Sequence, residues 1–120
     1  GVQAVSNLGE LEFDLISVSY ADGRSASLQL LRDPAPRHQG QLFTSEGSVR
    51  FEIHANTFYM RTMQQFLAMI ETGEPPIQYE DMLEALVVLL AAQRSQQQNG
   101  RVVRLSEMRS TRESMQPTIH

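Results

Sequence analysis

Residues 59–73 read YMRTMQQFLAMIETG, and here the chain changes from strand patterning to helix patterning. Asn56 or Thr57 is a candidate N-cap. Gly73 is a candidate stop, because glycine tolerates the left-handed backbone that ends many helices. Between these points, large apolar side chains recur every three or four residues, at Tyr59, Met63, Phe66, Leu67 and Ile70. This spacing predicts an amphipathic helix.

Downstream, Glu74-Pro75-Pro76 predicts a rigid link. A second helix is predicted from about Glu80 to Gln97, closed by Asn99-Gly100. Its centre, residues 85–92, is apolar on every side. A helix of that kind is normally buried on several faces. We therefore expect it to lie between a sheet and the first helix, or to face another chain.

Upstream, apolar and polar residues alternate with a period of two, which is typical of half-buried strands. The apolar positions alternate over 11–15, and the phase then slips over 16–20, which predicts a bulge near Leu15-Ile16. Asp22-Gly23 predicts a tight turn, and residues 26–30 resume the alternation as the returning strand. Together these segments predict a β-hairpin.

A second hairpin is predicted over 41–53 and a short strand over 101–105. From Ser106 onward the sequence is polar without sustained periodicity, which predicts a frayed tail. We therefore expect one domain over residues 1–107 and a polar tail over 108–120. The order of elements predicts an α+β fold: a two-layer sandwich with two main helices packed on one face of a mostly antiparallel sheet.

The other sheet face is predicted to be polar and built from small residues. If it is simply solvated, an antiparallel sheet would have this composition anyway. A flat surface of short side chains is equally suited to docking another domain or a second copy. The sequence leaves both readings open for Ser17, Ser19, Ser25, Ser27, Gln29, Arg50, Glu52 and His54.

Composition excludes several classes of function. The chain has 120 residues, no cysteine and no lysine, so cysteine metal sites, thiolate nucleophiles and Schiff-base chemistry are excluded. A net charge of -4 with scattered arginines argues against nucleic-acid binding. No apolar run approaches the roughly 20 residues of a membrane span. We expect a soluble protein in the cytoplasm. The start at Gly1-Val2 predicts that the chain is a processed piece of a longer protein.

No catalytic, metal or cofactor-binding residue is predicted within the chain. The three histidines do not stand at metal-ligand spacing, and no Gly-x-Gly-x-x-Gly or Gly-x-Ser-x-Gly motif occurs. The acidic residues Glu80, Asp81 and Glu84 fall in the first turns of the second helix, where they complement the helix dipole.

Several segments occur in an order that is typical of one family. The predicted helix at 58–70 is followed by ETGEPP at 71–76, and YED at 79–81 opens a helix that ends in AAQRS at 91–95. Further pieces are Gly100 with its valine strand, YADGRSA at 20–26 and EGSV at 46–49. In this order they resemble the carboxyl-terminal domain of the Gfo/Idh/MocA oxidoreductases, the glucose–fructose oxidoreductase and inositol dehydrogenase family. The resemblance covers about residues 11–107.

The resemblance implies a parent protein that moves hydride between NAD or NADP and a sugar- or polyol-like substrate. Family members hold the cofactor on an amino-terminal Rossmann domain and carry a Glu-Lys-Pro segment and an Asp-x-x-x-His pair. None of these occurs in this sequence. The chain is therefore expected to be a carboxyl-terminal part that holds no cofactor, is inactive alone and has the missing Rossmann domain as a partner.

In such proteins the sheet of this domain forms one wall of the substrate cleft and packs against a partner subunit. The resemblance thus implies a homo-oligomer formed through the open sheet face, with interface candidates Ser17, Ser19, Ser25, Ser27, Gln29 and Glu52. Candidates for substrate contact, from loop position or outer-face placement alone, are Arg37, His38, Arg50 and His54. No family motif falls on these four residues.

Two alternatives stay open. The chain is a free-standing α+β interaction or ligand-binding module, or it is a degenerate family member kept as a scaffold. The residues encoded before Val2 discriminate between these readings. A glycine-rich strand-turn-helix with a lysine-bearing loop favours the oxidoreductase, the same fold without that lysine favours the scaffold, and a start codon favours the module.

Overall fold

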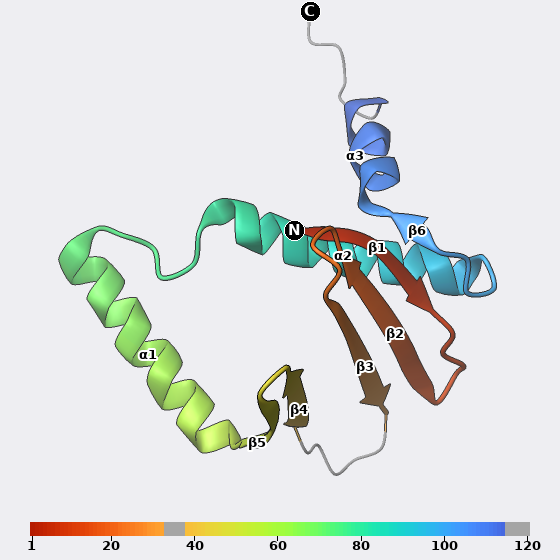
Figure 1. Ribbon diagram of the computed structural model, residues 1–120. Coiled ribbons are helices and arrows are strands. Elements are labelled where there is room, and N and C mark those ends of the chain that lie inside the picture. Colours follow the sequence, from red (N-terminus) through yellow and green to blue (C-terminus); the bar gives the residue numbers. More distant parts are fainter. Residues whose placement is uncertain (33–37, 115–120) are drawn as a thin grey trace, which may run out of the picture. The chain divides into compact units, whose positions relative to one another are not determined.

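The computed structural model describes residues 1–32 and 38–114 and has the predicted α+β fold (Figure 1). Residues 1–32 and 79–120 form one compact unit, here called unit 1, and residues 33–78 form unit 2. The sequence predicts one domain over 1–107, whereas the structure divides these residues between two units.

Unit 1 contains a four-stranded antiparallel sheet with the strand order β3-β2-β1-β6. Its strands are β1 (Val2–Asn7), β2 (Phe13–Tyr20), β3 (Ser25–Leu31) and β6 (Val103–Arg104). The sequence reading missed β1, which pairs with both β2 and β6. The letters VQAVSN contain only two valines, so the alternation is too weak to identify a strand. Tertiary pairing with two neighbours makes it one.

The predicted hairpin of β2 and β3 is confirmed. Gly23 has φ 87° in the turn, and the Asp22 carboxylate accepts a hydrogen bond from the backbone N–H of Arg24 at 3.1 Å. The predicted bulge near Leu15-Ile16 is wrong, because β2 pairs with β3 without interruption. Leu15 is apolar but lies on the exposed face, next to the buried Ile16. Two consecutive apolar residues therefore look like a bulge in the sequence although the strand is regular. The register shift of the sheet lies in β1, between Val2 and Ala4.

One face of this sheet is covered by α2 (Tyr79–Gln97), which lies against β1 (Figure 1). The small residues Ala91 and Ala92 let the helix approach closely, and both are buried. The core of unit 1 consists of seven buried apolar residues, Val5, Ile16, Val18, Ala91, Ala92, Val103 and Leu105. α2 ends as predicted, with Asn99 (φ 58°) and Gly100 (φ 82°) in the left-handed region.

The predicted tail is in part a helix, α3 (Leu105–Ser114). The expectation of an irregular chain is therefore wrong over 106–114, and residues 115–120 lie outside the described part. Glu107 starts the helix: its carboxylate accepts a hydrogen bond from the backbone N–H of Arg104 at 3.2 Å, as the glutamate of a capping box does. It also accepts two from Arg101, at 3.0 and 3.3 Å. The capping hydrogen bonds stabilise a helix in a segment whose polar composition predicted none.

Unit 2 contains the second predicted hairpin, β4 (His38–Thr44) and β5 (Gly47–Ile53), followed by α1 (Ala55–Thr72). The predicted N-cap is wrong, since His54 occupies that position and Asn56 and Thr57 lie within the first turn. The predicted stop is confirmed, because Gly73 adopts φ 72° and its N–H donates to the Met69 carbonyl. None of the residues of α1 is buried.

Among the described residues, no helix combines the length and apolar character that a membrane crossing requires.

Candidate functional site

The sheet face of unit 1 that turns away from α2 is lined by serines. Side chains alternate along a strand, and Ile16 and Val18 point into the core, so Ser17 and Ser19 point outward. Their partners across the β2–β3 ladder share that face. Ser17 pairs with Ser27, Ser19 with Ser25, and Leu15 with Gln29. The predicted grouping of these four serines with Gln29 on one face is therefore confirmed.

The serine face continues onto β1, which the sequence reading did not include. Ser6 is the register partner of Ser17, and Ala4 is the partner of Ser19. The hydroxyl of Ser19 donates a hydrogen bond to the Ala4 carbonyl at 3.3 Å, so this side chain lies along the sheet. Side chains of this size leave a flat surface that another backbone can approach closely. Ser6 could be assigned to this face only from the pairing of β1 with β2.

The residues of the predicted outer face do not lie on a single sheet. Arg50, Glu52 and His54 belong to β5 and its end in unit 2, whereas the serines belong to the sheet of unit 1. The prediction placed both groups on one sheet, and this is wrong because the two hairpins form separate sheets. On β5, Arg50 pairs with Gln41 and Glu52 with Gln39.

Two of the predicted substrate residues lie close together. His38 is the register partner of Ile53, the residue that precedes His54, so both histidines stand at one end of the β4–β5 hairpin. Arg50 is exposed nearer the turn of that hairpin, and Arg37 lies outside the described residues.

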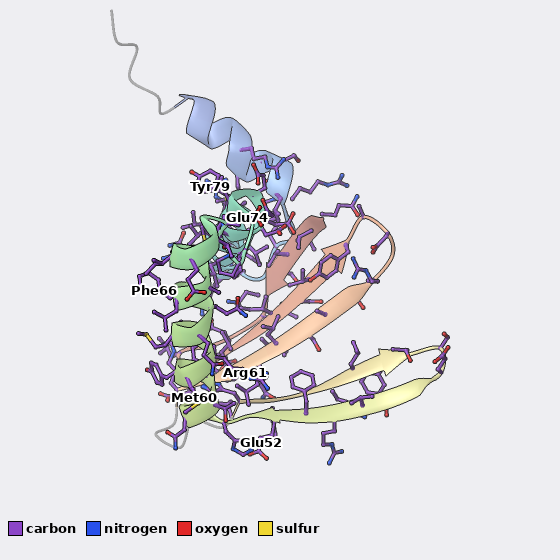
Figure 2. The ribbon with its side chains drawn as sticks, turned by 90° about the vertical axis from the view of Figure 1, so that its left-hand side faces the viewer. Glu52, Met60, Arg61, Phe66, Glu74 and Tyr79 are labelled. Atoms are coloured by element: carbon purple, nitrogen blue, oxygen red, sulfur yellow. The ribbon has the colours of Figure 1, made fainter. Side chains whose placement is uncertain are left out.

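A groove runs within unit 2 along one side of α1. Its volume is about 760 Å³, which is in the range of small-molecule sites. The apolar part of the lining includes Phe58, Phe66 and Met69, which recur at helical spacing. Polar groups enter from two elements: Glu52 projects from β5 and Arg61 from α1 (Figure 2). His54, one of the predicted substrate residues, also lines the groove.

His38 lines a second, smaller hollow in unit 2, of about 350 Å³. Ile53 and Phe58 border both hollows, so the two histidines flank the same apolar side chains. Within the described residues, no three histidine or acidic side chains gather in a way that would hold a metal ion. The groove offers apolar contact and hydrogen bonding, and the Arg61 guanidinium and the Glu52 carboxylate both line it.

One polar cluster that the sequence reading missed is buried between β1 and α2. The backbone N–H of Asn7 donates to the Ser95 hydroxyl at 2.8 Å. The Asn7 side chain accepts from the N–H groups of Gly9 and Leu15 and donates to Asp14 at 3.0 Å. Each group has a partner, so the cluster is structural. Ser95 stands four residues after Ala91, on the same face of α2, and this spacing is the sequence feature that could have predicted its burial.

Among the described residues, the side chains whose pKa is shifted lie at the surface of unit 1. The hydrogen bonds from Arg101 and from the Arg104 backbone lower the pKa of Glu107, and the same contact with Glu107 raises the pKa of Arg101. The backbone hydrogen bond from Arg24 lowers the pKa of Asp22. These groups fix a helix start and a hairpin turn, which are structural tasks.

Comparison of the chain with family models, curated proteins and solved structures finds no match.

Proposed function

We propose that this chain is the substrate-side and association part of an NAD- or NADP-dependent oxidoreductase that acts on a sugar- or polyol-like substrate. The observation that carries the proposal is the arrangement of unit 1, whose sheet is covered by α2 on one face and presents serines on the other. A sheet built in this way supplies a flat packing surface and no reactive group. The family in this proposal is supported by the order of the sequence segments at 20–26, 46–49 and 58–100, which resembles that of the Gfo/Idh/MocA oxidoreductases.

The cofactor would be held by polypeptide other than this chain. The residues described here do not fit a dinucleotide, because a phosphate-binding turn needs glycines between a strand and the N-terminus of a helix. β5 leads into α1 through His54, and β6 leads directly into α3. No step of hydride transfer is therefore assigned to residues of this chain.

Substrate contact is proposed for His38 and His54 of unit 2, with Arg50 and Arg37 as weaker candidates. Imidazoles donate and accept hydrogen bonds, so they suit the hydroxyl groups of a sugar or polyol. The groove beside His54 supplies apolar walls for the carbon skeleton.

The serine face is proposed to associate with a second copy of the chain. Replacing Ser27, which lies on this face, by arginine places a long charged side chain in the contact. Sedimentation velocity should then show an associating wild-type chain and a Ser27→Arg variant that associates less. Ser45→Arg is the matched control, because Ser45 lies in the β4–β5 turn. A strictly monomeric wild-type chain at high concentration would contradict the proposal.

The cofactor assignment has its own test. Isothermal titration of the purified chain with NAD and with NADP should detect no binding. Tight binding of either nucleotide would place the cofactor site on this chain and overturn the assignment. Reduction or oxidation of a sugar by the purified chain would do the same.

The groove of unit 2 favours a second candidate, a free-standing ligand-binding module. The two readings differ in what should bind. An isolated module should bind its ligand at this groove without any further polypeptide, whereas an oxidoreductase part needs the cofactor-bearing half to complete its cleft. Nuclear magnetic resonance screening of apolar, anionic and polyol probes against the chain alone distinguishes them, because only the module predicts shifts centred on Phe58, Arg61 and Phe66.

A further inference from the structure

α2 has a second apolar face, directly opposite the one that it buries. Ser95 lies on the buried face, and Leu86 precedes it by nine residues, which is a rotation of about 180° on a helix. Leu86 is 57% exposed and Leu89 58% exposed. The stripe also contains Tyr79, Met82 and Leu90, each at least 48% exposed. In unit 1 this stripe has no counterpart that covers it among the described residues.

The spacing of the stripe fits pairing with another helix. Successive members are separated by three, four and three residues, which is the spacing of a helix seam that packs knobs into holes, at Tyr79, Met82, Leu86 and Leu89. A single exposed leucine needs no explanation, but a continuous seam of this kind marks an interaction surface. The seam predicts a helical partner that lies nearly parallel or antiparallel to α2.

The charges beside the seam are complementary to those of a second, reversed copy. Glu80 precedes Arg94 by fourteen residues, close to four full turns, so both lie on the same side of the helix. In an antiparallel pair, residues on the same side of the two helices face each other. The midpoint between Glu80 and Arg94 is Val87, one residue from Leu86. A two-fold axis at Leu86 sets Met82 opposite Leu90 of the other copy and Leu86 opposite Leu86. The same axis brings each Glu80 within two residues, along the helix, of Arg94 of the other copy.

We propose that α2 forms an antiparallel pair with α2 of a second copy of this chain through this seam. The antiparallel arrangement also places the positive end of each helix dipole beside the negative end of the other. Five side chains, each about half exposed, bury on the order of 500 Å² per copy, or about 1,000 Å² in total, which is the lower limit for a specific interface. The dimer is therefore weak and depends on protein concentration.

The test is sedimentation equilibrium in the Ser27→Arg background, with the wild-type chain in parallel. This background is expected to weaken association through the serine face, so that the two proposed interfaces are measured separately. Glu80→Arg or Arg94→Glu should each raise the dissociation constant of the dimer about tenfold or more. The double variant Glu80→Arg/Arg94→Glu should restore dimerisation, because the reversed charges again face each other. Leu86→Arg should abolish it.

Asp81→Arg is the matched control, since it makes the same change of charge one residue from Glu80 on the other side of the helix, and it should dimerise normally. Circular dichroism of each variant shows whether it has folded. A folded chain that stays monomeric at every concentration would overturn the proposal. So would a dimer that ignores both single charge reversals, or a double variant that fails to recover, because either result would mean that something else occupies the seam.

Discussion

Replacing Ser95 by alanine tests the packing of α2 on the sheet of unit 1. Ser95 is 0% exposed, and its hydroxyl oxygen accepts a hydrogen bond from the Asn7 backbone N–H at 2.8 Å. Alanine removes the acceptor and leaves this N–H buried without a partner. A water molecule could replace the hydroxyl only by fitting into the space that this one oxygen atom leaves.

The expected loss follows from the burial of the pair. An unsatisfied buried donor costs about 1–3 kcal/mol. Alanine forms helices better than serine by up to about 0.5 kcal/mol, which offsets part of this cost. The free energy of unfolding should therefore fall by about 0.5–2.5 kcal/mol. Against a total stability of about 5–15 kcal/mol, this is a large fraction.

The assay is urea unfolding followed by circular dichroism, with the midpoint and slope compared between variants. Ser106→Ala is the control, because Ser106 is an exposed serine in the first turn of α3, and its replacement should change stability little. If Ser95→Ala unfolds at the same urea concentration as Ser106→Ala, the hydrogen bond between α2 and β1 does not stabilise unit 1. The reasoning from burial would then be refuted.

Two further outcomes are expected in unit 1. Gly100→Ala should lower the free energy of unfolding by about 1–2 kcal/mol, because Gly100 has φ 82° and a Cβ there would overlap the Leu8 side chain. Thermal unfolding measures this loss. Gly23→Ala is the control: Gly23 has φ 87° but open space around it, so its replacement should lower the free energy of unfolding by less. For Glu107, the folded pKa is lowered, so the stabilisation of α3 is present above the ordinary glutamate pKa and is lost as pH falls through the lowered value. Hydrogen exchange of α3 amides should accelerate on acidification, and Glu107→Gln should show that acceleration already at neutral pH; identical exchange in the variant and the wild-type chain would exclude this role.

Local patterns in the sequence determined most of the elements of this protein. The helical spacing from Tyr59 to Ile70, the Asp22-Gly23 turn and the glycine after each long helix act within a few residues, so each can be recognised without knowing what lies nearby in space. The alternation of serines with Ile16 and Val18 likewise predicted one serine-lined face, because strand geometry fixes which side chains share a side.

The tertiary structure alone decided the features that depend on distant partners. β1 is a strand because it pairs with both β2 and β6, and its six residues carry too little contrast to show this. Whether Arg50 and Glu52 share a sheet with the serines depends on which strands pair, and a sequence pattern identifies a strand without identifying its neighbour. The burial of Ser95 against Asn7, 88 residues away, and the exposure of Leu86 opposite it both depend on where α2 packs. A helix that is apolar all round does not reveal which of its faces remains open.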